Sequence, residues 1–208
     1  MDDDLRQEIE RRQVTDAWRR IDTWLSAHAP ASLAVLRPGA TEDEIDRLQT
    51  TLGVRIPAGL RALWRLHAGV NVDPSASFLL GRWSLMDFAS VVHTYEREMM
   101  LQRLPGADRF TLWRHAWIPV CSYSADDSSY GLYMDAETGK LGYWDKYGER
   151  RIEFESLTTY LEEMADSLEA PSLVTGYRPG LVNDSLVWGP PEHPSERALW
   201  VEYTGQTR

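Results

Sequence analysis

Three aspartates near the middle of the chain carry side chains suited to acid–base or metal chemistry. Asp126 and Asp127 precede a strand-like segment, and Asp135 ends it. Carboxylate oxygens can bind a hard cation or act as a general acid and base. Aspartate also favours turns, because its side chain bonds to nearby backbone groups. Turn formation is the simpler interpretation, and an enzyme that uses these carboxylates is the alternative.

Other residue types that commonly do chemistry are poorly placed for it. Cys121 lies in an apolar segment with no histidine nearby in sequence to activate the thiol, so we expect it in the core. Residues 139–142 read GKLG, which lacks the first glycine and the final Ser/Thr of a phosphate-binding loop. The histidines are too far apart in sequence to suggest a metal site by spacing: His28, His67, His93, His115 and His193. The sequence therefore predicts no catalytic residue, no cofactor and no metal.

Aromatic and charged side chains alternate in the same region, and these types favour binding to another protein. Exposed Tyr and Trp supply large contact areas at low entropic cost, and carboxylates around them favour a basic partner. Because strand side chains alternate between faces, some of these residues could instead belong to the core and others to ordinary surface. The predicted partner-binding residues are Asp126, Asp127, Tyr130, Trp144, Asp145, Lys146, Tyr147 and Glu149.

Four short segments position this cluster, at residues 117–122, 129–135, 140–145 and 150–154. Each is rich in aromatic or β-branched residues, and turn-forming sequences such as Asp-Asp-Ser and Thr-Gly separate them. Such short connections require neighbouring strands to run antiparallel. The pattern predicts an antiparallel β-meander.

Apolar residues at three- and four-residue steps predict helices before and after the meander in the sequence. Thr41 and Glu44 form a capping-box pair, in which each side chain can satisfy the backbone amide of the other residue. Residues 78–83 suggest a short strand. The predicted helices run from Val14 to Pro30, from Thr41 to Gly53, from Pro57 to Gly69, from Ser84 to Met99 and from Ser156 to Pro171.

Composition excludes several classes of protein. The chain has 208 residues, of which 43% are hydrophobic and 26% charged, which fits one globular domain with an appendage. A net charge of −10 repels phosphate and anionic lipid, so we expect neither nucleic acid nor membrane as a partner. Residues 1–115 carry 15 basic and 16 acidic side chains, whereas residues 116–208 carry 7 and 16. This acidic second part suits a basic partner, or it simply solvates the surface.

The ends of the chain suggest a location and a domain plan. One cysteine, an acidic amino terminus and no long apolar run predict a cytoplasmic protein without a signal peptide.

We expect residues 1–170 to form the main domain, with its core from about residue 15. Residues 171–208 are rich in proline and glycine, with strand-like pieces at 186–188 and 198–203, and should pack on this domain as an extension. Trp188 and Trp200 should be buried there.

Motifs between about residues 15 and 170 resemble the SUKH superfamily. The resemblance rests on ATEDEIDRLQTTLGVRIPAGLRALWRLHAGVN at 40–71, WIPV at 117–120, GLYMDAETGKLGYWDKYGE at 131–149 and the helix from Ser156. It implies an α+β fold, with an antiparallel sheet packed against helices and no shared catalytic residues. Residues 171–208 lie outside the common pattern.

The same resemblance implies a non-catalytic protein that binds other proteins. The superfamily includes yeast regulators of cell-wall assembly and many bacterial immunity proteins. We therefore expect an immunity protein that neutralises a nuclease-type toxin through an acidic, aromatic-rich face. A regulator or scaffold in cell-wall assembly or signalling is the alternative, and the carboxylate enzyme described above is a third possibility.

Overall fold

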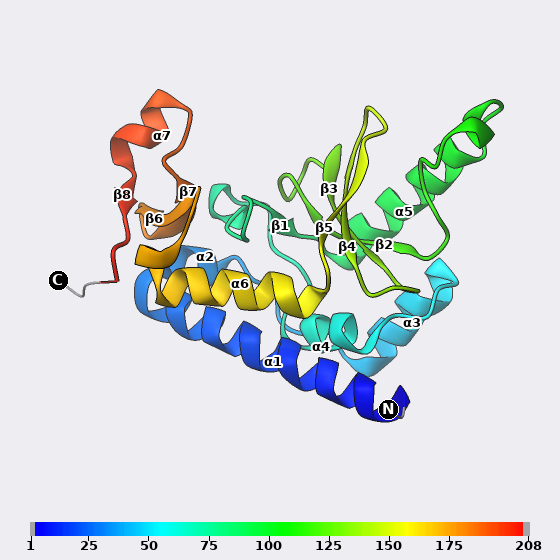
Figure 1. The fold of residues 1–208 in the computed structure, drawn as a ribbon, viewed down its shortest axis with the longest axis horizontal. Helices are drawn as coiled ribbons and strands as arrows, with labels where there is room; N and C mark the ends of the chain where they lie inside the picture. Colours follow the sequence, from blue (N-terminus) through cyan, green and yellow to red (C-terminus); the bar gives the residue numbers. More distant parts are fainter. Residues whose placement is uncertain (1–2, 206–208) are drawn as a thin grey trace.

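Helices and antiparallel strands form the α+β architecture that the sequence predicts. The structure is a computed structural model and describes residues 3–205. The helices are α1 (Asp3–His28), α2 (Pro30–Ala34), α3 (Glu42–Leu52), α4 (Ala58–Leu66), α5 (Phe88–Gln102), α6 (Leu157–Glu169) and α7 (Pro194–Leu199). The strands are β1 (Ser84–Leu85), β2 (Trp117–Ser122), β3 (Tyr130–Asp135), β4 (Leu141–Asp145), β5 (Arg150–Phe154), β6 (Arg178–Val182), β7 (Ser185–Gly189) and β8 (Val201–Glu202). Figure 1 shows α1 and α6 lying side by side below the main sheet.

The main sheet is an antiparallel meander in which β1 to β5 pair in chain order. Strands β2 to β5 match the four predicted segments to within one residue. Leu132 of β3 lies opposite Tyr143 of β4, which in turn lies opposite Arg151 of β5. Because neighbouring residues of a strand point to opposite sides, this register also fixes which side chains share a face.

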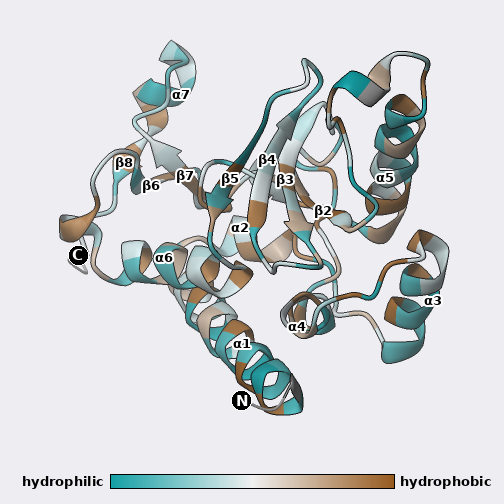
Figure 2. Ribbon diagram, turned by 45° about the vertical axis from the view of Figure 1, so that its right-hand side comes forward, coloured by the Kyte–Doolittle hydropathy of each residue, from teal (hydrophilic) through white to brown (hydrophobic). Residues whose placement is uncertain are grey.

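Helices cover both faces of the sheet. On one face, Trp113 lies 5.4 Å from Tyr133 and 5.7 Å from Trp144, measured between ring centroids, and α5 packs on this side. On the other face, Phe154 of β5 lies 4.9 Å from Tyr160 of α6. Figure 2 shows the sheet between α5 and α6. At the end of the second face that lies away from α6, Tyr130 and Tyr143 are partly exposed.

Helix α1 carries the apolar stripe that the sequence predicts. Val14, Trp18, Ile21 and Leu25 are fully buried where α1 packs against α4 and α6. The helix begins eleven residues earlier than predicted, because its first turns lie largely on the surface and show little apolar periodicity. Within residues 3–205, no helix is both long and apolar enough to cross a bilayer.

The end signals of two predicted helices are confirmed. The Thr41 hydroxyl accepts the Glu44 N–H at 3.3 Å, and the Glu44 carboxylate accepts the Thr41 N–H at 2.8 Å. Gly53 ends α3 with a left-handed φ of 68°, which glycine adopts without strain. Ser156 accepts an amide from the first turn of α6 and caps that helix. These local signals depend on a few adjacent residues, so the sequence reveals them directly.

Two predictions around residue 84 are wrong. Residues 78–83 contain one isolated bridge rather than a strand. Ser84 does not begin a helix but pairs within the sheet as part of β1. Helix α5 begins at Phe88, because the Asp87 carboxylate accepts the Ser90 N–H at 2.8 Å and caps it. Asp87, two residues after Leu85 in the apolar pattern, therefore sets the start of α5.

The carboxy-terminal segment forms a second antiparallel sheet in the order β7-β6-β8, beside α2 (Figure 1). The sequence does not predict β6 or α7, because the prolines in both segments favour a loop. Trp188 is fully buried, and its indole N–H donates to the Phe78 carbonyl at 2.8 Å. The Ser185 and Ser75 hydroxyls are 2.7 Å apart. Trp200 is only half-buried.

Candidate protein-binding face

The β2–β3 and β4–β5 turns lie at the same end of the sheet, because the meander reverses direction at each turn. Tyr130, the first residue of β3, is paired with Asp145, the last residue of β4. Bonds from Ser129 hold the pKa of Asp127 below its usual value, and the charge of Lys146 from the other turn adds to this effect. We call this exposed end the turn-end face and define it as Trp83, Tyr123, Asp126, Asp127, Tyr130, Tyr143, Lys146, Tyr147 and Glu149.

Aromatic rings form a continuous patch on this face. The Trp83 ring centroid lies 6.1 Å from that of Tyr130 and 6.2 Å from that of Tyr143. The Tyr123 ring lies 4.5 Å from Tyr130. Tyr123 is 46% exposed, and Tyr147, on the adjacent turn, is 84% exposed. A surface with this many accessible rings offers a large apolar contact area with polar hydroxyl groups at its edge.

Tyr130 and Tyr143 keep their protons at physiological pH. Burial raises the pKa of Tyr130 to about 12, and its hydrogen bond with Tyr123 and the negative charge of Asp127 act in the same direction. Burial also raises the pKa of Tyr143. Both hydroxyls can therefore donate and accept hydrogen bonds with a partner.

Charges around the patch are of both signs. Asp126, Asp127 and Glu149 are acidic, but Lys146 lies among them with its ammonium 5.2 Å from the Tyr147 ring centroid. The guanidinium of Arg151, on the neighbouring strand β5, lies 4.0 Å from the Tyr143 ring centroid. Helix α6 holds more of the acidic excess, since it carries four carboxylates and no basic residue: Glu162, Glu163, Asp166 and Glu169. The turn-end face is aromatic with a mixed rim, whereas the sequence suggested an acidic one.

A buried carboxylate stands behind the turn-end face. Glu98 of α5 is 3% exposed. One of its oxygens accepts from Arg97, with Nη2 at 3.0 Å, and the other accepts from Nη2 of Arg150 at 3.1 Å. Burial lowers the pKa of the Arg150 guanidinium, and the negative charge of Glu98 opposes this effect. Glu98 thus joins α5 to β5 through Arg150 and also binds Arg97, its neighbour on α5.

The same two arginines hold the turns. Arg97 Nη2 donates to the Ser128 carbonyl in the β2–β3 turn at 2.6 Å. Arg150 Nη1 donates to the carbonyls of Asp145 at 2.8 Å and Glu149 at 2.7 Å, on either side of the β4–β5 turn. The buried network therefore fixes the position of both turns relative to α5.

Two of the eight predicted partner-binding residues lie inside the protein and cannot contact a partner as predicted. Trp144 is fully buried beneath Trp113, because its position on β4 faces the side that α5 covers. Asp145 is 9% exposed, and its carboxylate accepts the N–H groups of Tyr147 at 2.8 Å and Glu149 at 2.9 Å. Trp144 packs in the core beneath the face, and Asp145 holds the β4–β5 turn. The other six lie at its surface or edge, where their role in binding stays a prediction.

Sequence reasoning missed three residues that shape the site. Trp83 joins the patch only through tertiary packing, because it is far from β3 and β4 in sequence. Tyr123 directly follows β2 and belongs to the region already identified. Glu98 carried a usable signal, since it lies three residues after Tyr95 and seven after Val91, on the buried side of α5. A charged residue on an apolar stripe indicates a buried partner.

The aspartates considered for catalysis do not come together. Asp126 and Asp127 lie at one end of β3 and Asp135 at the other. Asp135 shapes the β3–β4 turn by accepting the Glu137 N–H at 2.9 Å. Cys121 is buried, which raises the pKa of its thiol. Among residues 3–205, no three His, Cys, Asp or Glu side chains are grouped so that they could hold a metal ion.

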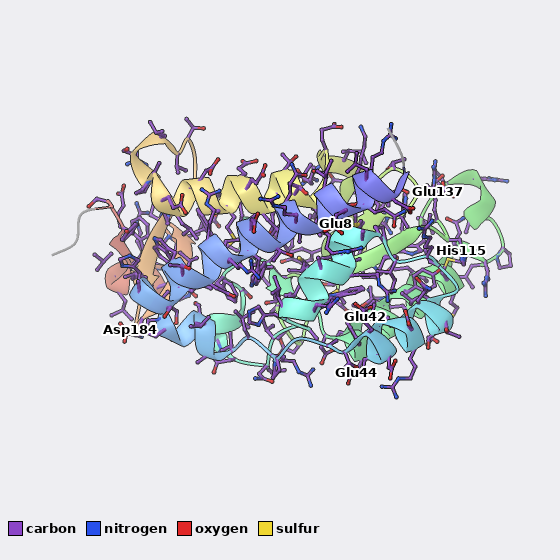
Figure 3. All side chains as sticks on the ribbon, turned by 90° about the horizontal axis from the view of Figure 1, so that it is seen from below. Glu8, Glu42, Glu44, His115, Glu137 and Asp184 are labelled. Carbon is purple, nitrogen blue, oxygen red and sulfur yellow. The ribbon has the colours of Figure 1, made fainter. Side chains whose placement is uncertain are left out.

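A polar groove of about 950 Å³ lies elsewhere, between α1, α4 and the β3–β4 turn. Glu42 and Glu137 line it, as the view from below shows (Figure 3). Arg61 bonds to Glu42 at 2.5 Å and to Asp46 at 2.6 Å, and Arg65 bonds to Glu42 at 2.8 Å. These bonds tie α3 to α4 along one wall of the groove.

Comparisons with known proteins match the central part of the chain. The sequence profile of the SMI1 / KNR4 family (SUKH-1) matches residues 39–163, which include α3, α5 and all strands of the main sheet. A KNR4/SMI1 homolog of Kluyveromyces lactis is 42% identical over 53 residues, covering 26% of this chain and 10% of that protein. A KNR4/SMI1 homolog of Eremothecium gossypii is 37% identical over 79 residues, covering 36% of this chain and 12% of that protein. The F-box protein SKIP16 of Arabidopsis thaliana is 34% identical over 62 residues, covering 30% of this chain and 14% of that protein. The matches thus span at most about a seventh of the length of these relatives.

Proposed function

Because the chain belongs to the SMI1 / KNR4 family (SUKH-1), we propose that it is a non-catalytic protein-binding module whose turn-end face contacts the partner. The observation that carries the proposal is the aromatic patch of Trp83, Tyr123, Tyr130 and Tyr143, in which Tyr123 is accessible, with the exposed Tyr147 on the adjacent turn. Interfaces are enriched in such residues, and a few aromatic anchors commonly supply most of the binding energy.

The rigidity of the face supports the same proposal. Both turns are tied to α5 through Arg97, Arg150 and the buried Glu98. A partner that binds a preformed surface loses less free energy to ordering than one that must fix mobile turns. The network therefore favours tight binding to one shape.

Within this role, we propose toxin neutralisation as the specific activity. A nuclease toxin needs a basic surface for phosphate, and the net charge of −10 on this chain would attract it over long range. The rim of the face is mixed in charge. We therefore propose that the net charge of the whole protein speeds association with the toxin, and that the aromatic anchors slow its dissociation. The module would then cover the active site of the toxin and exclude its substrate.

A regulator or scaffold in cell-wall assembly or signalling is the second candidate. The similarity to two yeast KNR4/SMI1 homologs favours it. The same turn-end face would then bind a cellular partner instead of a toxin, and strong long-range charge attraction would be unnecessary.

Affinity capture separates the two candidates. The protein serves as bait in extracts of the cells that produce it, at low and at moderate salt, and mass spectrometry identifies what is retained. Recovery of one basic toxin-like protein, more strongly at low salt, supports neutralisation, because screening weakens attraction between opposite charges. Recovery of envelope or signalling proteins supports the regulator. If neither class is retained, the proposed binding role is contradicted.

A kinetic variant tests the steering mechanism. Asp126→Lys changes an exposed charge on the rim without touching the aromatic patch. With a captured toxin, the association rate should fall and depend less on salt, whereas the dissociation rate should change little. An unchanged association rate would contradict electrostatic steering of the toxin by this protein.

A further inference from the structure

One segment of the chain, residues 75–83, connects the carboxy-terminal extension to the aromatic patch, and we call it the support loop. Figure 1 shows the chain that leads into β1 beside β7 of the extension. The match to the SMI1 / KNR4 family ends at residue 163, so the extension, described over residues 171–205, lies outside it. The support loop therefore joins a part of the chain inside the family match to a part beyond it.

The first half of the support loop is attached to β7 by two contacts. The indole N–H of the buried Trp188 donates to the Phe78 carbonyl at 2.8 Å. The hydroxyls of Ser75 and Ser185 are 2.7 Å apart and form the second contact. A buried carbonyl that lost its only donor would be costly, so Trp188 fixes the position of this backbone.

The second half of the support loop is a tight turn that carries Trp83. The Leu79 N–H donates to the Trp83 carbonyl at 3.0 Å, which closes the turn. Gly81 and Arg82 both adopt positive φ angles, of 85° and 66°. A residue other than glycine keeps such a conformation only where its surroundings hold it. Arg82 Nη2 donates to Glu196 of α7 at 3.2 Å, so the extension also holds this half.

The support loop contacts the aromatic patch at two points. The Trp83 ring lies 6.1 Å from Tyr130 and 6.2 Å from Tyr143, measured between centroids. The Ser77 hydroxyl donates to the Tyr123 carbonyl at 3.1 Å. Aromatic pairs interact at centroid distances of about 4.5–7 Å, so a shift of about 1–2 Å would separate Trp83 from the tyrosines. The arrangement of the patch therefore depends on where this loop is held.

We propose that the extension is a specificity element, which holds the support loop and so sets the position of Trp83 in the turn-end face. The position of Trp83 determines the shape of the partner surface that this face accepts, because interfaces require close shape complementarity. This role rests on the function proposed for the face. Glu196 and Trp188 act as positioning residues, since they work through Trp83. Tyr160 of α6 also donates to the Leu80 carbonyl at 2.9 Å, so loss of the extension contacts should shift the turn without unfolding it.

The first test needs no partner and follows Trp83 directly. The protein is labelled with 5-fluorotryptophan, and the fluorine resonance of Trp83 is assigned by its loss in Trp83→Phe. Glu196→Arg places a second positive charge against Arg82, so this resonance should shift. Hydrogen exchange at the Leu79 amide should accelerate by about fivefold, the scale of one exposed ion pair. The double variant Arg82→Glu/Glu196→Arg should restore both values, because it exchanges the two charges.

Two further variants make this test specific. Glu192→Arg is the matched control, because it makes the same charge change at an exposed residue of the extension that forms no ion pair within residues 3–205. It should leave the Trp83 resonance unchanged. Trp188→Phe keeps an aromatic ring but removes the donor to the Phe78 carbonyl, so it should shift the resonance. An unchanged Trp83 resonance and Leu79 exchange rate in Glu196→Arg, with the protein folded, would overturn the proposal.

The second test separates this proposal from the proposed function. The dissociation constant of the captured partner is measured for Glu196→Arg, for Glu192→Arg, which has the same net charge, and for Tyr147→Ala. Glu196→Arg should bind about threefold or more weakly than Glu192→Arg. If Tyr147→Ala weakens binding but the two charge variants bind equally, the specificity role is overturned while the proposed function stands. If Tyr147→Ala also binds like the wild type, the proposed function of the face is contradicted, and the specificity role is overturned with it.

Discussion

Glu98→Ala should lower the free energy of unfolding by about 3 kcal/mol, because it leaves two arginines without their shared carboxylate. Glu98 is 3% exposed, and the Arg150 side chain is 9% exposed. Removing one member of a buried ion pair costs about 3–5 kcal/mol, since the other charge stays buried without compensation. The Arg97 side chain is 30% exposed, so water can solvate it in part. The lower end of the range therefore applies.

Urea unfolding followed by tryptophan fluorescence measures this change, because Trp113 and Trp144 lie close to the network. The slope of the free energy of unfolding against urea concentration should equal that of the wild type if the variant unfolds in one step from a native fold. Glu98→Gln keeps the shape and one acceptor oxygen, so its loss should be smaller, about 1–2 kcal/mol. Glu96→Ala, on the exposed side of the same helix, is the control and should change stability by less than about 0.5 kcal/mol.

A loss below about 1 kcal/mol for Glu98→Ala would refute the reasoning, because it would fall within the net contribution of one ordinary hydrogen bond. In that case the backbone carbonyls of Ser128, Asp145 and Glu149 alone would hold the two arginines. The turns of the candidate face would then not depend on the buried carboxylate.

Three smaller perturbations test other parts of the account. Tyr147→Ala should change the free energy of unfolding by less than about 0.5 kcal/mol, because the ring is 84% exposed, and thermal unfolding checks this. Thr41→Ala should cost about 1 kcal/mol in urea unfolding, because it removes the hydroxyl that accepts the Glu44 N–H. Burial lowers the pKa of His67, but the hydrogen bond and charge of Asp22 outweigh it and raise the pKa above the usual 6.5. The protonated ring therefore stabilises the fold below about pH 6.5, and this contribution is lost as pH rises through the folded pKa. The stability difference between the wild type and Asp22→Asn should shrink over the same interval, and a difference independent of pH would contradict this assignment.

The sequence predicts the helix ends and the meander well, because each depends on residues that are near in the chain. The capping box at Thr41 and Glu44 and the glycine at position 53 act within one turn. The four meander strands alternate with short turns, so their order follows from chain connectivity alone. Strand β6 cannot be predicted in this way, because Pro179 and Gly180 suggest a loop and only pairing with β7 and β8 makes the segment a strand.

The candidate site is only partly predictable for a related reason. The sequence places Tyr130 and Tyr147 in the correct region, but it cannot tell that Trp144 faces α5, because both faces of this sheet are covered. Alternation separates two faces without saying which one a helix will bury. Trp83 joins the patch from a distant segment, so no local pattern connects it to the meander.

The most direct test of the central claim is the dissociation constant of the captured partner for the wild type and for two matched variants. Tyr147→Ala removes a ring that is 84% exposed on the turn-end face, and Leu173→Ala removes a side chain that is 80% exposed outside it. We predict that Tyr147→Ala weakens binding by about tenfold or more, as expected for an aromatic anchor. Leu173→Ala should bind like the wild type. Equal affinity of the wild type and Tyr147→Ala, with both proteins folded, would contradict the claim that Tyr147 and the turn-end face contact the partner.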